Sequence, residues 1–286
     1  MLQGVMLLWF LLTALSLLYV VIDIRTTPES PVLKWGFILL TAYTGPLGAF
    51  LYVLGCREPL PGLHEQYVAT RWRQVLGSTM HCVAGDGVGI LAGAVIGSLF
   101  HLPKGADIAL EYLLGFGFGW SIFQSLFMRS MAGGSYMRAL SSTFFPELLS
   151  MNCLMAGMVP AMTWAMKSAP ASHHPSGPAF WFVMSMALLV GFITAYPMNW
   201  WLVSRHMKHG MMTMRPSLAS VKGAVDEMMH DAHSPHEHTG GEQRTSKLPV
   251  DGDMKPVSNS VLAWMTILSF VIFGFGLSLA VIFGGL

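Results

Sequence analysis

The chain has 286 residues, of which 53% are hydrophobic and 11% are charged, and its formal net charge is +1. A soluble domain carries about 25% charged residues, so this composition excludes an ordinary soluble domain. The small net charge provides no basic surface for a nucleic acid.

The apolar residues are gathered in blocks of roughly twenty residues, the length that a helix needs to cross a bilayer. The sequence therefore predicts an all-α fold, a polytopic integral membrane helical bundle of about seven transmembrane helices within the lipid bilayer. The predicted spans are roughly 4–24, 33–54, 78–100, 109–130, 146–166, 179–203 and 260–284. We expect a six-helix transmembrane region over 1–203, a His/Met-rich polar and largely disordered loop over 204–258, and a C-terminal transmembrane helix within 259–286.

The distribution of basic residues predicts the orientation of the chain. With the N-terminus inside, twelve Lys and Arg residues fall in inner loops and four in outer loops, namely Arg25, Lys34, Lys104 and Lys167. Because cytoplasmic loops carry the excess of Lys and Arg, this favours a cytoplasmic N-terminus and an outer C-terminus. The expected location is the inner (plasma) membrane of a bacterium.

The third span carries a glycine ladder and three polar residues. Gly85, Gly89, Gly93 and Gly97 recur every four residues, which predicts close contact with another helix. Cys82 and Asp86 lie on the glycine face, so Asp86 should point into the bundle, and His81 begins the same region. A carboxylate at membrane depth indicates function by default. Asp86 could instead be protonated or pair with a polar neighbour such as Gln124.

The fourth span has a similar small-residue spacing. Gly115 and Gly119 lie four residues apart, as do Gln124 and Met128. Close packing is the plain interpretation, with the latter two as possible pore-lining residues.

The fifth span has a stripe of thioethers. At about 100° per residue, Glu147 and all five methionines of this span fall within an arc of roughly 100°. These methionines are Met151, Met155, Met158, Met162 and Met166. Thioethers suit Cu(I) and are poor ligands for Mg, Ca or Mn, but methionine is also an adaptable packing residue. The stripe is either a row of metal ligands or packing.

Soft and imidazole donors also follow the sixth span. They are His206, Met207, His209, Met211, Met212 and Met214, followed by His230, His233, His236 and His238. Such tracts are typical of metal capture, although the spacing fits no closed zinc finger. The alternative is a polar loop in which histidine only adds solubility.

Two stretches resemble an uncharacterised bacterial family of polytopic membrane proteins, a "domain of unknown function" family. One is "MHCVAGDG", which carries an HCxxG core, and the other ends in "YPMNWWL", which matches YPxNWWL. The resemblance covers about 80–250, implies a membrane fold and draws attention to His81, Cys82 and Asn199. Asp86 stands where the family often has cysteine, which puts a cysteine-based site in doubt.

These observations favour a metal-ion permease, most suited to Cu(I) or another soft metal ion, with the methionines of the fifth span as pathway. The expected ligands are Met151, Met155, Met158, Met162, Glu147, His81, Cys82, Asp86, His206, His209 and Met211. Two alternatives stay open: a membrane anchor or assembly factor that holds copper for a partner oxidase or exchanges it with a copper chaperone, and a transporter of a non-metal solute. No HExxH motif, nucleophile with its base, or carboxylate pair at working spacing predicts an enzyme, and no permanently bound cofactor is expected.

Overall fold

The computed structural model describes residues 2–129, 133–211 and 257–285, and these residues contain helices and no β strand. Five helices are long and apolar enough to cross a membrane. They are α1 (Leu2–Asp23), α5 (Arg71–Leu99), α8 (Tyr136–Ser168), α9 (Pro178–Ser204) and α11 (Asn259–Leu279), the last extended by the π-helical turn η3 (Ala280–Gly284). The predicted all-α membrane bundle is confirmed. The predicted count of about seven spans is not confirmed.

The fourth predicted span is a helix with a change of winding. It begins as α6 (Lys104–Phe118), passes through a π-helical turn, η1 (Gly119–Gln124), and ends as α7 (Ser125–Met128). Single π turns inside helices are rare overall, and those that occur often lie at functional sites. Here the turn places Gly119 and Gln124 beside α5 and α8.

The second predicted span is a hairpin of two short helices. α2 (Pro31–Thr44) has 14 residues and α3 (Pro46–Gly55) has 10, so each is about 21 Å long or less and neither crosses ~30 Å of hydrocarbon. Gly45 joins them with a φ of 60°, followed by Pro46. The two helices run side by side, with the rings of Phe37 and Tyr52 5.4 Å apart.

Both ends of this hairpin lie beside the end of α1. The Tyr52 hydroxyl donates to Asp23 at 2.7 Å and lies 2.8 Å from the Thr27 hydroxyl. The hairpin therefore enters the bundle and returns to the same face, and the expectation that 33–54 crosses the membrane is wrong. Its physical cause is the Gly45–Pro46 turn, which breaks the apolar block in its middle.

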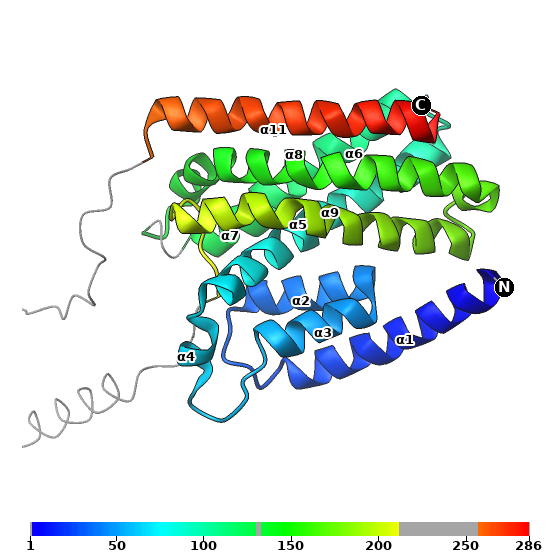
Figure 1. The fold of residues 1–286 in the computed structure, drawn as a ribbon. Coiled ribbons are helices and arrows are strands. Elements are labelled where there is room, and N and C mark those ends of the chain that lie inside the picture. Colours follow the sequence, from blue (N-terminus) through cyan, green and yellow to red (C-terminus); the bar gives the residue numbers. More distant parts are fainter. Residues whose placement is uncertain (1, 130–132, 212–256, 286) are drawn as a thin grey trace, which may run out of the picture.

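Because the hairpin returns to the end of α1, the start of α1 lies at the same end of the bundle as the last described residues of the chain. Gly285, the last described residue, accepts from Lys104 at the start of α6, and the Trp9 ring contacts Phe182 near the start of α9. Figure 1 shows both termini at the same end of the bundle. This arrangement differs from the expected placement of the termini on opposite sides.

We call this end the terminal end, and the opposite end, where α1 and α9 finish and α5 and α8 begin, the basic end. The short helix α4 (His64–Val68) lies at the basic end, and the 3-10 helix η2 (Pro170–His173) joins α8 to α9 at the terminal end. Nine of the described Lys and Arg residues belong to segments at the basic end. These are Arg25, Lys34, Arg57, Arg71, Arg73, Arg129, Arg138, Arg205 and Lys208, whereas only Lys104 and Lys167 belong to the terminal end.

The glycine ladder of α5 confirms the predicted close packing. A Cβ atom on Gly89 would meet the backbone of Leu114, and one on Gly93 would lie 2.8 Å from the Glu111 Cα. The backbones of α5 and α6 therefore touch along the ladder, as small residues allow.

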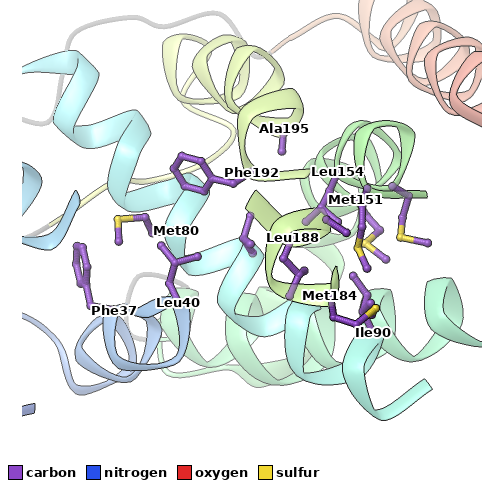
Figure 2. Close-up of a cluster of buried hydrophobic side chains, with 14 of the residues drawn as sticks. Phe37, Leu40, Met80, Ile90, Met151, Leu154, Met184, Leu188, Phe192 and Ala195 are labelled. Carbon is purple, nitrogen blue, oxygen red and sulfur yellow. The ribbon is translucent and has the colours of Figure 1, made fainter. Parts of the chain in front are cut away.

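The apolar core lies where α5, α8 and α9 meet. Figure 2 shows Met151, Leu154, Met184, Leu188 and Ile90 together in this core, and each of them is buried. α8 begins at Tyr136 rather than near 146, so Pro146 lies inside the helix and not in the expected first turn.

Candidate functional site

A buried lysine lies among acidic and thiol groups at membrane depth. The Lys208 Nζ donates to Cys82 Sγ at 2.7 Å and to Glu147 Oε2 at 2.9 Å. The Cys82 thiol in turn donates to Glu147 Oε2 at 3.4 Å. We call Cys82, Asp86, Glu147 and Lys208 the lysine cluster; none of these residues is more than 1% exposed.

Asp86 faces Glu147 across the space left by Gly119. A Cβ atom on Gly119 would collide with Asp86 Oδ1 and lie 2.8 Å from Glu147 Oε1. Asp86 Oδ1 and Oδ2 and Glu147 Oε1 are buried, and none of them has a hydrogen-bond partner among the described residues. Since an ionised carboxylate only accepts, a hydrogen bond between the two carboxyl groups forms only when one of them carries a proton. The expectation that Asp86 points into the bundle is confirmed, and no hydrogen bond joins it to Gln124.

The segment 205–211, which follows α9, carries Lys208 into the bundle. His206 adopts a φ of 55°, and the chain then turns back over the start of α5. The Gln74 side chain donates to the Met211 carbonyl at 3.0 Å. The Met211 side chain fills the space beside Gly77 and Gly55. These contacts hold Lys208 in place without a helix.

The charge of Lys208 is compensated in this setting. Its Nζ and Glu147 Oε2 form an ion pair at 2.9 Å, and neither side chain is exposed. A buried ammonium needs such a partner.

His81 and Gln124 lie at the edge of the cluster. The His81 ring is 2% exposed and packs against Phe127 and Phe123, with centroids 4.8 and 5.7 Å away. The Gln124 Oε1 lies 4.0 Å from the Cys82 thiol. These two residues are neighbours of the cluster rather than members of its core.

Four methionines of α8 face the interior of the bundle. Met151, Met155 and Met158 are fully buried and Met162 is 4% exposed, so the stripe does not face lipid. A Cβ atom on Gly115 would lie 2.7 Å from the Met151 Cε and 3.3 Å from the Asp86 carbonyl. The stripe, defined as these four methionines, therefore starts beside the lysine cluster.

The stripe leads to a cavity at the terminal end. This cavity has a volume of about 350 Å³ and is lined by Met162, Met166, His173, Lys104 and Asp107, among others. Between cluster and cavity, the stripe is closely packed with Leu154, Met184 and Leu188 (Figure 2). Passage of any ion along it would require these side chains to move.

The His and Met donors after α9 that the structure describes do not form one site. His206 is exposed and His209 half-buried, whereas Met211 is buried between α3 and α5. Burial, followed by the charge of His206, lowers the pKa of His209. Met212, Met214 and the four histidines from His230 to His238 lie outside the described residues, as does most of the loop expected to be disordered.

Asn199 connects two helices by hydrogen bonds. Its side chain donates to the Ser150 hydroxyl at 2.9 Å and to the Ala195 carbonyl at 3.1 Å, and it is fully buried. It ties α9 to α8 one residue before Met151.

Sequence reasoning missed Lys208 as a site residue, and Gly119 as more than a packing residue. Lys208 follows an apolar span by four residues, where a basic residue ordinarily marks the membrane surface. Its sequence neighbourhood contains no signal that it turns inward. The space at Gly119 depends on the π-helical turn, which the pattern of residues does not predict.

Residues 71–208 match a family model described as "Domain of unknown function (DUF4396)". The expected resemblance to an uncharacterised family is confirmed over this segment. The match includes the whole lysine cluster and the stripe, and it leaves out α1, the α2–α3 hairpin and α11. No curated protein and no solved structure matches the chain.

Proposed function

We propose that the protein is a membrane permease for a soft metal cation, with Cu(I) as the best chemical fit. The observation that carries the proposal is the position of the lysine cluster at the head of the methionine stripe. Thiol and thioether sulfurs are the donors that suit Cu(I). A row of weak sites lets an ion bind and also leave.

The charges of the cluster give Lys208 a role. When Asp86 and Glu147 are both ionised, they carry two negative charges, and Lys208 carries one positive charge. The cluster is then neutral only when one proton or one additional cation joins Lys208. An isolated charge in this buried setting is costly. In the proposed cycle, Lys208 holds Cys82 and Glu147 in the absence of metal. An arriving Cu(I) displaces Lys208 from the Cys82 sulfur, the thiol proton passes to ionised Asp86, and Lys208 stays beside Glu147 as its counter-charge, so that the cluster is neutral.

The displacement couples the ion to the segment 205–211. Lys208 lies on a short non-helical stretch that is anchored by Met211 and Gln74. Release of the ammonium from Cys82 loosens this stretch at the basic end, while the stripe provides the route to the cavity at the terminal end.

We also propose that the basic end is cytoplasmic and that both termini are outside. Apart from the buried Lys208, eight basic residues at that end against two at the other support this orientation by the positive-inside rule. A bacterial inner membrane is the proposed location.

The test is anaerobic Cu(I) uptake by proteoliposomes that enclose a Cu(I)-specific fluorescent chelator. Wild-type protein should carry copper inward, and Cys82→Ser and Glu147→Gln should each reduce the initial rate at least tenfold. Cys153→Ser is the matched control, because Cys153 is buried among Leu149, Met198 and Leu202 in a separate apolar cluster.

Binding of Cu(I) without uptake would replace the permease by a copper-holding anchor or assembly factor. Absence of both binding and uptake in the wild type would overturn the metal proposal and favour a non-metal solute.

A further inference from the structure

A second group of metal-binding side chains lies at the base of the α2–α3 hairpin. It consists of Glu29 from the segment after α1, Cys56 at the end of α3, and His64 at the start of α4. One ligand atom from each residue lies within 4.8 Å of the others. We call these residues the hairpin trio.

The trio is buried and its members come from three separate segments. Glu29 is 4% exposed, His64 is 1% exposed, and Cys56 is fully buried. Buried acidic and imidazole groups are costly unless they pair or coordinate a metal. A chance cluster of surface acids does not have this burial or this mixture of sulfur, nitrogen and oxygen donors.

The separation of the His64 and Glu29 ligand atoms fits a tetrahedral ion. Zinc–ligand bonds of 2.0–2.3 Å place neighbouring ligand atoms ~3.4–3.6 Å apart. His64 Nε2 and Glu29 Oε1 are separated by 3.7 Å. This is longer than an ordinary hydrogen bond and close to the separation that a shared zinc ion imposes.

The surroundings already orient one ligand. The other oxygen of Glu29, Oε2, accepts from the Ser30 backbone N–H at 3.3 Å. Ser30 also caps α2, since its hydroxyl accepts from the Leu33 N–H. Such outer contacts fix the direction of a metal-ligating carboxylate.

The charge of the trio distinguishes a divalent ion from Cu(I). A thiolate and a carboxylate together carry two negative charges, and the histidine binds a metal as the neutral imidazole. A divalent ion makes this buried set neutral, whereas Cu(I) leaves one uncompensated charge. Carboxylate oxygen is also a harder donor than Cu(I) prefers.

We propose that Glu29, Cys56 and His64 bind a zinc-class divalent ion that fastens the base of the hairpin to α4. The fourth tetrahedral position is available to water. The site lies outside the matched segment 71–208 and is separate from the permease proposal.

The experiment is titration of the purified full-length protein with Co²⁺, a spectroscopic substitute for Zn²⁺, followed by competition with Zn²⁺. The expected result is one equivalent of cobalt with a sulfur-to-metal charge-transfer band that zinc removes. The band should be absent in Cys56→Ser and unchanged in Cys153→Ser, because the Cys153 thiol lies in a separate apolar cluster.

Glu29→Gln is the second variant, in case Cys56→Ser does not fold. It keeps the shape of the side chain and should weaken cobalt affinity by about tenfold or more, the loss that even an outer-shell change produces. Zinc should also raise the midpoint of thermal unfolding in wild type but not in Glu29→Gln. No stoichiometric cobalt binding in wild type, or a charge-transfer band that persists in Cys56→Ser, would overturn the proposal.

Discussion

Arg57, just after α3, donates through its Nε to both carboxylate oxygens of Asp23, the last residue of α1, at 3.0 and 3.1 Å. Two segments that a seven-span topology places on opposite sides of the membrane are thus in direct contact. This ion pair holds the end of α3 against the end of α1, so that the hairpin begins and ends at the same end of the bundle.

Thiol labelling tests this topology. Thr26, Gln66 and Ser176 are exposed, the first two at the basic end and the third at the terminal end. In intact cells, an impermeant maleimide should label Ser176→Cys but neither Thr26→Cys nor Gln66→Cys. The wild type provides the background, since its three cysteines are buried. Labelling of Thr26→Cys together with Ser176→Cys would restore the seven-span topology.

Gly119→Ala tests the contact between the two carboxyl groups. The added methyl group would collide with Asp86 and crowd Glu147, which should lower the free energy of unfolding by ~1–3 kcal/mol, as overpacking does. Gly117→Ala is the matched control on the same helix, because its Cβ would meet nothing within 4 Å. That change should leave stability equal or higher. Thermal unfolding in detergent measures both, and equal midpoints would contradict the placement of Asp86.

Lys208→Met should be strongly destabilising, because it leaves a buried carboxylate without its counter-charge. The expected loss is about 3–5 kcal/mol, as for other broken buried ion pairs. Adding Glu147→Gln removes the orphaned charge and should restore much of that loss. Lys167→Met is the control, since Lys167 lies exposed and donates only to the Phe283 carbonyl. A double variant no more stable than Lys208→Met would show that the two residues do not act as a pair.

A triple leucine variant separates the ligand role of the stripe from its packing role. The variant replaces Met151, Met155 and Met158. Each change nearly conserves volume and should cost under ~1.5 kcal/mol. Anaerobic Cu(I) titration of the folded triple variant should show loss of the intramembrane copper sites. Met80→Leu and Met198→Leu, buried methionines outside the stripe, should leave binding intact. Undiminished copper binding by the triple variant would make the stripe a packing feature.

The parts of the fold that sequence predicted are those set by regular periodicity. The Gly85–Gly97 ladder and the methionine stripe each recur every three or four residues, so helical geometry alone assigns them to one face. The inward direction of Asp86 follows from the same face. The structure confirms all three placements.

The hairpin was missed because hydropathy counts apolar residues and not their direction. Residues 33–54 have the length of a span, and the Gly45–Pro46 pair was the signal that they turn back. Such dipeptides mark turns more often than helix interiors.

Lys208 and the hairpin trio could not be predicted in this way. Lys208 reaches Cys82 across 126 positions of the chain, and Glu29, Cys56 and His64 show no ligand spacing along the sequence. Their association depends on how the segments at the basic end fold together, which local patterns do not encode.

The tip of the hairpin also constrains how the protein folds. Gly45 is buried against Trp9 and Thr13 of α1, about ten residues before the end of that helix. Irregular backbone at membrane depth is tolerated only where protein covers it. α1 supplies that cover, so the turn at Gly45 is accommodated only when α1 and the hairpin pack together.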